Sequence, residues 1–340
     1  MPIRERYEFA SDNTAAICPE AWAALAEANH DAAASYGDDR WTKQVSDKVR
    51  ELFETDCESF FVFNGTAANS LSLAQLCRPF QSVLCHEYSH IETDECGAPE
   101  FFSGGSKLLR VGGANGKIDL ADAAEVLARQ RELHSPKPRA LSLTQATELG
   151  TVYQPNELDA VAEFAKKHEL LIHMDGARFA NAVASLGCAP KEITWSRGVD
   201  VLSFGGTKNG LAVGEIVVFF RKELAAEFDY RAKQGAQLAS KMRFIAAPWA
   251  GLLENDVWLQ NARHANNAAE KLSEQLETDL AFPREASALF LRLSDEKVAQ
   301  MHGRGWHFYK FIEPDVYRLM CSWSVTDEDI ADFVADFRNS

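Results

Sequence analysis

Several features that would point to a membrane, secreted or nucleic-acid-binding protein are missing from this sequence. No stretch of about 18 consecutive apolar residues occurs, and the start MPIRERYEFASDN has no apolar segment of the kind a signal peptide needs. The net charge of -15 opposes a nucleic-acid backbone or an anionic membrane, and no basic run is long enough to reverse that field locally. We therefore expect a cytoplasmic protein whose partner is a small molecule.

Paired cysteines and linkers are missing as well. The seven cysteines are scattered, odd in number and without a C-x-x-C pair, which is typical of reduced thiols in a cytoplasmic protein. No internal repeat and no Pro-, Gly- or Ser-rich linker interrupts the chain. With 46% hydrophobic and 25% charged residues, the composition is that of a globular protein that needs no metal or disulfide to fold.

Short β-branched or aromatic runs alternate with longer helical patterns from about residue 47, which predicts an α/β architecture with a mostly parallel, seven-stranded sheet. The strands are expected at 59–63, 82–85, 107–111, 139–143, 170–175, 200–205 and 211–220. A long polar helix then precedes short strands at 288–293, 306–312 and 316–322 and a final helix, which predict a small α+β module. We expect a large domain over 1–250 and a small C-terminal domain over 251–340.

The segment HMDGAR at 173–178 places an aspartate where a predicted buried strand ends. Open α/β sheets bind ligands at this carboxyl edge, so Asp175 is a candidate binding residue. A carboxylate there can hold a pyridinium nitrogen protonated, which makes pyridoxal 5'-phosphate an electron sink. A helix-capping or turn aspartate before Gly176 is the alternative.

The segment SFGGTKNG places Lys208 after a strand that ends in small residues, which let a backbone and a cofactor approach closely. A lysine confined there loses hydration, which lowers the pKa of its amine and frees it to form a Schiff base. A solvated loop lysine is the alternative. A P-loop is excluded, because GGTKNG lacks the G-x-x-x-x-G-K-[ST] spacing.

A third element is NGTAAN, where a strand runs directly into a helix. The main-chain donors of Gly65 and Thr66, with the Thr66 hydroxyl, would point from a helix N-terminus at an anion, which suits a cofactor phosphate. An ordinary strand-to-helix turn capped by Asn64 or Thr66 is the alternative.

The stretch HEYSH at 86–90 matches the H-E-x-x-H pattern of zinc proteases. Such a site needs the five residues inside a helix and a third ligand, whereas here a predicted strand closely precedes them and IETDECG offers only crowded acidic residues near a Cys and a Gly. We expect no metal, and expect His90 to cover one face of a pyridine ring. A zinc hydrolase using His86 and His90 is a remote alternative, and a His86 satisfied by local hydrogen bonds is another.

In this order, the elements around Gly65, His90, Asp175 and Lys208 resemble the threonine aldolases of the fold type I, aspartate-aminotransferase-like enzymes that use pyridoxal phosphate. The resemblance spans nearly the whole chain, and its further motifs are FASDN, YGDD, SHI, DGAR and YRLMCS. The segments ICPEAW, ETDECGAPEFF and QATELGTVY resemble those of the low-specificity L-threonine aldolase and phenylserine aldolase branch. The resemblance implies a fold type I, transferase-like large domain, with the N-terminal segment 1–45 contributing to the active site.

The resemblance also implies residue roles. Lys208 would hold the cofactor covalently, Asp175 would pair with the pyridine nitrogen and His90 would stack on the ring. Gly65 and Thr66 would bind the phosphate, and Ser11, Arg178 and Arg318 would bind the substrate α-carboxylate, with Arg178 also among the cofactor-binding residues. Arg243 would contact a phosphate from a neighbouring subunit, and Tyr36 would bind substrate as a contact across the interface. Arg forks suit a carboxylate well. We expect a homodimer or homotetramer with active sites at the subunit interface.

The implied activity is cleavage of L-threonine, L-allo-threonine or related β-hydroxy-α-amino acids such as phenylserine to glycine and an aldehyde. One departure matters: family members commonly carry E-N-T-H-N where this chain has QATEL, which puts Glu148 in place of a histidine. The β-hydroxyl proton would pass to Glu148, His90 or an activated water. A β-eliminating lyase or a hydroxymethyltransferase is the alternative within this chemistry, and a non-catalytic scaffold would require Lys208 to be absent or misplaced.

Overall fold

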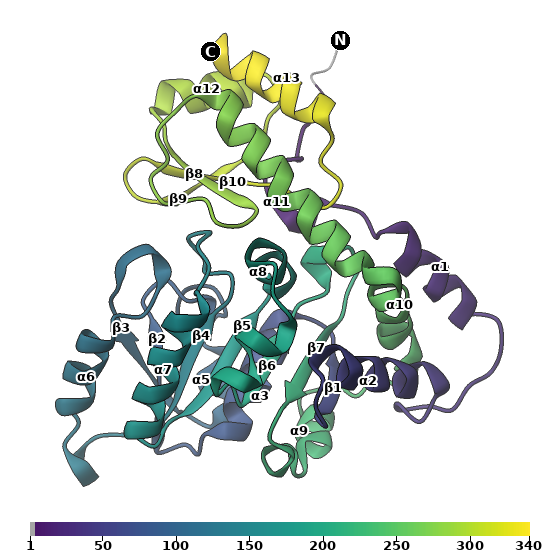
Figure 1. Ribbon diagram of the computed structural model, residues 1–340, viewed down its shortest axis with the longest axis vertical. Helices are drawn as coiled ribbons and strands as arrows, with labels where there is room; N and C mark the ends of the chain where they lie inside the picture. The colour runs from purple at the N-terminus through teal and green to yellow at the C-terminus, as the bar shows by residue number, and fades with distance from the viewer. Residues whose placement is uncertain (1–3) are drawn as a thin grey trace.

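The computed structural model describes residues 4–340, which form two β-sheets and the helices around them (Figure 1). The larger sheet has the strand order β1-β7-β6-β5-β4-β2-β3, and only β7 runs antiparallel to its neighbours. The predicted seven-stranded, mostly parallel sheet is confirmed. Its strands are β1 (Glu58–Val62), β2 (Gln81–His86), β3 (Lys107–Val111), β4 (Lys137–Thr144), β5 (Leu171–Gly176), β6 (Val201–Phe204) and β7 (Glu215–Phe219).

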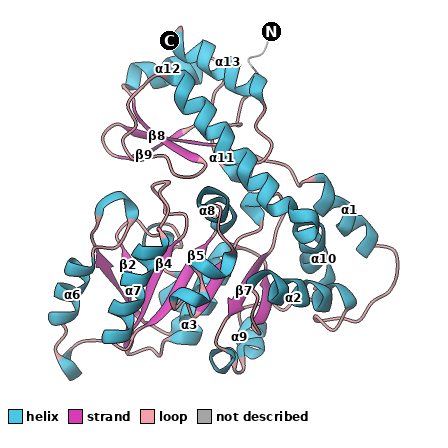
Figure 2. Ribbon diagram, viewed as in Figure 1, coloured by secondary structure: helices cyan, strands magenta, loops and turns pink. Residues whose placement is uncertain are grey.

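Both faces of this sheet are covered by helices (Figure 2). Successive strand residues point to opposite faces: Leu141 and Ile172 belong to one buried cluster, while Ala140 and Leu171 belong to another that includes residues of α3. Because both faces are buried, the strands read as almost continuous apolar runs, and this is why they were easy to predict.

Helix α7 shows how the sequence sets the start of a helix. It begins at Pro155, and the Glu157 carboxylate accepts a hydrogen bond from the Gln154 backbone N–H at 2.6 Å, so its first turn is capped. The helices longer than one turn are α1 (Pro19–Ala28), α2 (Arg40–Phe53), α3 (Gly65–Leu76), α5 (Ala98–Ser103), α6 (Leu120–Ala128), α7 (Pro155–Lys167), α8 (Phe179–Leu186), α9 (Phe228–Gln234), α10 (Arg243–Leu253), α11 (Val257–Leu276), α12 (Asp295–Gly303) and α13 (Asp327–Arg338). Within residues 4–340, none of the helices combines the length and apolar character that crossing a membrane requires.

The smaller sheet is antiparallel, with the order β8 (Ala288–Arg292), β10 (Val316–Met320) and β9 (Tyr309–Ile312), so the three predicted C-terminal strands are confirmed. Helix α11 joins the two sheets (Figure 1): Trp258 packs in the core of the large sheet, and Leu272 packs in the core of the small one. Phe9 also packs in the small core. The division at residue 250 stays a prediction, and residues 1–3 of the predicted large domain lie outside the described part of the chain.

Candidate active site

The carboxyl ends of β4, β5 and β6 carry the first group of predicted site residues. Asp175, near the end of β5, is 4% exposed and lies beside Thr144 of β4 and Ser203 of β6. Asn69 Nδ2 donates to Asp175 Oδ2 at 2.8 Å, and the Ala177 backbone N–H donates to Oδ1 at 2.9 Å. A carboxylate held through both oxygens at this edge is fixed in orientation, as a partner for a ligand cation requires.

Lys208 follows β6 in the short 3-10 helix Thr207–Asn209. A side chain at Gly205 would place a Cβ 2.5 Å from the Ala177 carbonyl oxygen, and one at Gly206 would place it 2.4 Å from the Trp249 ring, so only glycine fits in this approach. Burial lowers the pKa of the Lys208 amine, and the Arg178 charge lowers it further, while Asp12 and Asp175 act in the opposite direction. The amine is therefore easier to deprotonate than an ordinary lysine.

Arg178 lies at the start of α8 and forms a two-pronged ion pair with Asp12. Its Nε and Nη2 donate to the two Asp12 oxygens at 2.6 and 3.0 Å. Burial disfavours both charges, but the pair outweighs it, raising the pKa of Arg178 and lowering that of Asp12. Sequence reasoning missed Asp12, although it stands in FASDN beside the predicted Ser11, whose hydroxyl accepts from the Asn13 N–H at 3.2 Å.

Arg318 belongs to β10 of the small sheet, and its guanidinium interacts with the charges of Arg178 and Asp12. Burial, followed by the charge of Arg178, lowers the pKa of its guanidinium to about 10. The guanidinium lies 4.8 Å from the Tyr309 ring centroid, and its Nε is buried without a hydrogen-bond acceptor among residues 4–340. Two close cations with an unsatisfied donor are suited to an anion such as a carboxylate.

Glu148 lies in the loop after β4. Its Oε1 accepts from the His90 backbone N–H at 2.7 Å and from the Thr144 hydroxyl at 2.9 Å. Its Oε2 is buried and has no hydrogen-bond partner within the described chain. Burial, followed by the charge of Asp175, raises the pKa of Glu148 to about 7. One oxygen is thus anchored, and the other is available to hold a proton.

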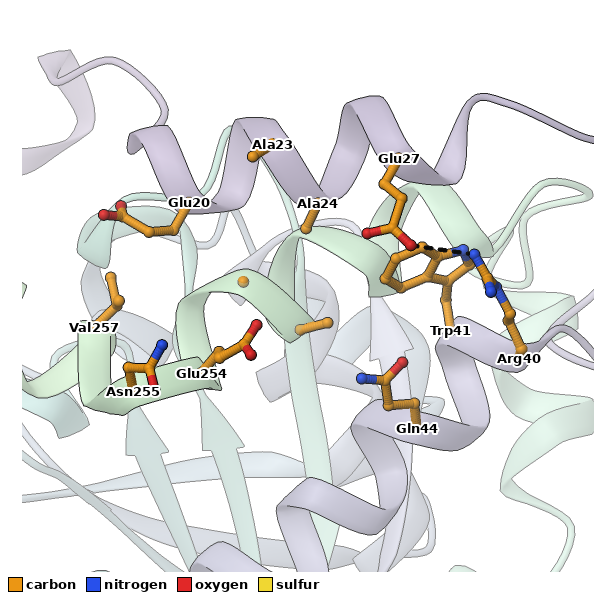
Figure 3. Close-up of a pocket in the computed structure, with 12 residues that line it drawn as sticks. Glu20, Ala23, Ala24, Glu27, Arg40, Trp41, Gln44, Glu254, Asn255 and Val257 are labelled. Carbon is orange, nitrogen blue, oxygen red and sulfur yellow. Dashed lines mark hydrogen bonds and ion pairs between the residues drawn. The ribbon is translucent and has the colours of Figure 1, made fainter.

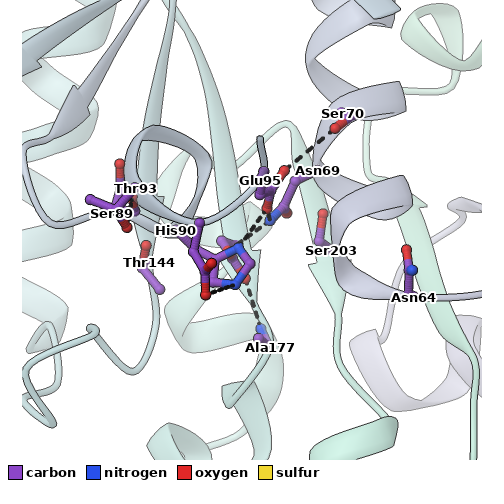
Figure 4. Close-up of polar contacts among 12 residues, drawn as sticks. Asn64, Asn69, Ser70, Ser89, His90, Thr93, Glu95, Thr144, Ala177 and Ser203 are labelled. Carbon is purple, nitrogen blue, oxygen red and sulfur yellow. Dashed lines mark hydrogen bonds and ion pairs between the residues drawn. The ribbon is translucent and has the colours of Figure 1, made fainter. Parts of the chain in front are cut away.

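His90 starts the one-turn helix α4 (His90–Thr93) and belongs to a chain of polar side chains (Figure 4). Its Nδ1 lies 2.8 Å from Glu95 Oε1, and Asn69 Nδ2 donates to that same oxygen at 2.8 Å. The contact with Glu95 raises the pKa of His90. Sequence reasoning missed both partners: Glu95 was counted only among the acidic residues of ETDECG, and Asn69 only as part of a helix.

Gly65 and Thr66 form the first turn of α3, at the same edge of the sheet. Asn64 caps the helix, because its side chain accepts from the Ala67 N–H at 2.9 Å. In the part of the chain that the structure describes, the backbone N–H groups of Gly65 and Thr66 have no acceptor, and no atom lies within 4 Å of a Cβ built on Gly65. This helix start is open and suited to an anion.

Tyr36 and Arg243 make their hydrogen bonds with residues other than Lys208. Arg243 Nε donates to the Ala28 carbonyl at 3.2 Å, and the Tyr36 N–H donates to the Ser240 carbonyl at 3.2 Å, so both pack around the start of α10. Across residues 4–340, neither has a hydrogen bond, ion pair or ring contact with Lys208, Asp175 or Arg178.

The HEYSH segment does not form the helix that a zinc protease needs. His86 ends β2, whereas His90 begins α4, so the five residues span a strand end, a turn and a helix start. His86 Nδ1 accepts from the Tyr88 N–H and its Nε2 lies 3.1 Å from the Gly113 carbonyl, so this ring is satisfied locally. Over residues 4–340 no three His, Cys, Asp or Glu side chains are grouped as metal ligands.

A separate cavity of about 360 Å³ lies between α1, α2 and α10 (Figure 3). Its walls carry Glu20, Glu27 and Glu254, and Arg40 pairs with Glu27 at 3.3 Å. None of the predicted site residues lines it, and it lacks the convergence of acid, base and cation found at the sheet edge. The candidate active site is therefore the group around Lys208.

Comparison with known proteins identifies what the chain as a whole is similar to. Residues 8–293 match the beta-eliminating lyase family. The chain is 55% identical to a low specificity L-threonine aldolase of Pseudomonas aeruginosa over 335 residues, and 53% identical to one of Pseudomonas sp., with 97% of each chain covered in both cases. Among solved structures, a Leishmania major threonine aldolase superimposes with a TM-score of 0.92 at 26% identity, covering 97% of this chain and 98% of that one.

Proposed function

This chain belongs to the beta-eliminating lyase family and is a lyase dependent on pyridoxal phosphate, and from that premise we propose that it cleaves L-threonine and related β-hydroxy-α-amino acids to glycine and an aldehyde at Lys208. The observation that carries this proposal is the buried amine of Lys208 beside Arg178, Asp12 and Asp175, at the carboxyl edge of the sheet. The experiment below also tests which substrate, L-threonine or phenylserine, the protein prefers.

The residues present fit the cofactor. Lys208 would hold it covalently, Asp175 would pair with its ring nitrogen, and the free N–H groups of Gly65 and Thr66 would hold its phosphate. When bound, the cofactor accepts the electron pair that is released as the Cα–Cβ bond breaks. His90 would lie against the ring.

Arg178 and Arg318, with Ser11 nearby in the chain segment of Asp12, are proposed to bind the α-carboxylate of the substrate. The Nε of Arg318 has no acceptor among residues 4–340, and Asp12 uses only two of the five donors of Arg178, so donors are left for an incoming anion. Fixing this carboxylate sets which bond at Cα faces the cofactor and hence which bond breaks.

Glu148 is proposed to take the proton of the β-hydroxyl at its unpaired Oε2. The aldehyde can leave only if the β-hydroxyl oxygen of the substrate loses its proton. A carboxyl group whose pKa is raised to about 7 can accept that proton near neutral pH. A β-elimination would instead require removal of the Cα proton and loss of the β-substituent, and a hydroxymethyl transfer would require a second acceptor substrate.

A homodimer or homotetramer with active sites at the subunit interface is also proposed. Tyr36 and Tyr230 are 48% and 74% exposed and line one shallow pocket. Arg243 has no hydrogen bond or ion pair with Lys208 among residues 4–340. Light scattering would test this, because a fully active monomer contradicts it. A cytoplasmic location stays a prediction.

The deciding experiment compares the purified protein with Lys208→Ala and with Lys222→Ala, an exposed lysine paired with Asp56. We expect an absorption band near the visible edge, and release of glycine with the matching aldehyde from L-threonine or phenylserine, in the parent and in Lys222→Ala only. Loss of activity in Lys208→Ala should exceed about a thousandfold. A parent with the band but no aldehyde would move the assignment to elimination, and activity retained in Lys208→Ala would refute it.

A further inference from the structure

Two neighbouring carboxylates flank the ring of His90, and their surroundings are opposite. Glu95, whose side chain is fully buried, lies 2.8 Å from Nδ1. Asp94, whose side chain is 84% exposed, lies 3.7 Å from Nε2. An exposed carboxylate at that distance is screened by water and holds a ring weakly, whereas a buried one at hydrogen-bond distance holds it firmly. The orientation of the His90 ring is therefore decided by Glu95.

The donors around Glu95 decide which atom carries the proton. Asn69 Nδ2 donates to Glu95 Oε1 and to Asp175 Oδ2, both at 2.8 Å, so its two hydrogens are used on two carboxylates. The opposite amide orientation would place an oxygen against both carboxylates, which is unfavourable. Burial raises the pKa of Glu95, but its hydrogen bonds with His90 and Asn69 oppose this, and an oxygen that already accepts from Asn69 favours a further donor from the ring.

We infer that Glu95 is a positioning residue that fixes His90 with a proton on Nδ1 and leaves Nε2 on the accessible side of the ring, and that Asn69 links this pair to Asp175 in one hydrogen-bonded chain. The inference rests on the proposed function only where it assigns a catalytic purpose to the orientation of His90. The inference concerns the tautomer of His90 and a coupling among four side chains, both of which are measurable in the resting protein.

Several elements contribute charges that face this ring. They are Asp94 and Glu95 after α4, Asp175 of β5, and Lys208 after β6. Glu148 after β4 meets the backbone N–H of His90 and not its ring. Glu95 contributes the largest effect and raises the pKa of His90, burial opposes it, Asp175 raises it and Lys208 lowers it. Removing the charge of Glu95 should therefore lower the pKa of His90 more than removing that of Asp94.

The first test is long-range ¹H–¹⁵N correlation spectroscopy on the holoenzyme with ¹⁵N-labelled histidine, over a pH series. The chain has 9 histidines, so loss of one set of signals in His90→Asn identifies this ring. At pH values above its pKa, we expect a protonated Nδ1 and an unprotonated Nε2. A proton on Nε2 in the parent protein would overturn the inference without any need for a variant at Glu95.

The second test compares Glu95→Gln with its matched control Asp94→Asn. The first should lower the pKa of His90 by about one unit, because a buried, hydrogen-bonded charge is lost, and the second by much less. Glu95→Gln should also lower kcat more than it raises KM, since a positioning residue acts on the ring and not on the substrate. An unchanged His90 pKa in Glu95→Gln would refute the assignment. An aldolase assay that fails in the parent would refute the proposed function and leave these spectra unaffected.

Discussion

Two clusters of acidic and basic side chains in this protein differ in how deeply they are buried. The edge cluster, Asp12, Glu148, Asp175, Arg178 and Lys208, lies at the carboxyl ends of the parallel strands. The surface cluster, Arg50, Asp56, Glu58 and Lys222, lies beside β1. The side chains of Arg178 and Asp12 are 11% and 3% exposed, whereas those of Lys222 and Asp56 are 47% and 70% exposed.

The cause of the pKa shifts separates the two clusters. For Lys208 and Glu148 the largest cause is burial, which favours the neutral form of each group. For Lys222 the largest cause is the hydrogen bond with Asp56, which favours the charged form and raises its pKa. Burial shifts the pKa of Lys208 and of Glu148 toward the neutral form, which prepares each group to exchange a proton. The exposed pair keeps both of its charges and contributes little to stability.

The largest expected effect in this comparison is that of Asp12→Ala, which leaves Arg178 buried without its counter-ion. Breaking a buried ion pair by removing one partner typically costs about 3–5 kcal/mol in the free energy of unfolding. We expect a loss of this size in urea unfolding at pH 7, together with a raised KM because Arg178 is no longer held in place.

The pH dependence gives the control for Asp12. The pKa of Asp12 is lowered in the folded state, so its contribution to stability is fully present above the unfolded-state pKa of about 3.9. This contribution is lost as the pH falls from that value through the lower, folded-state pKa. The difference in stability between the parent and Asp12→Ala should therefore shrink in acid. An equal difference at pH 7 and in acid would show that the pair is not what stabilises this region.

Glu148→Gln should have the next largest effect. The amide oxygen can still accept from the His90 N–H and from Thr144, so stability should hardly change, but no proton acceptor remains at the second atom. We expect kcat to fall by about 10²–10⁴, the usual contribution of a general base. In the parent, kcat should rise with pH through about 7 as Glu148 ionises, and this rise should disappear in the variant.

Glu148→Asp is the matched variant, since it keeps the carboxylate and should recover part of the rate. If Glu148→Gln keeps the parent's rate and pH profile, then His90 or a water molecule takes the proton.

The smallest effect is expected for Lys222→Ala in the surface cluster. Both Lys222 and its partner Asp56 are exposed, so water replaces the lost contact. The urea midpoint and kcat should stay within error of the parent, at both low and high salt. A clear loss of stability would contradict the distinction that we draw between buried and exposed pairs.

Much of the fold could be predicted because its signals are local. The apolar runs that became β1 to β7 are buried on both faces, and the small sheet followed from ALFLRL, WHFYKFI and VYRLMCS. Packing across the fold was not visible in the same way. Phe9 joins the core of the small sheet, and α11 spans both cores, because contacts between distant segments depend on tertiary packing.

For the site, local sequence patterns predicted Asp175 near the end of a strand, Lys208 in the loop that follows a strand, and Gly65 at a helix start. The partners of these residues depend on tertiary packing. It paired Arg178 with Asp12, brought Arg318 from the other sheet, and joined Asn69 and Glu95 to His90. The physical reason is that ionisation and hydrogen bonding depend on burial and on neighbours within a few ångströms, and here those neighbours are as many as 166 residues away in the chain, as for Arg178 and Asp12.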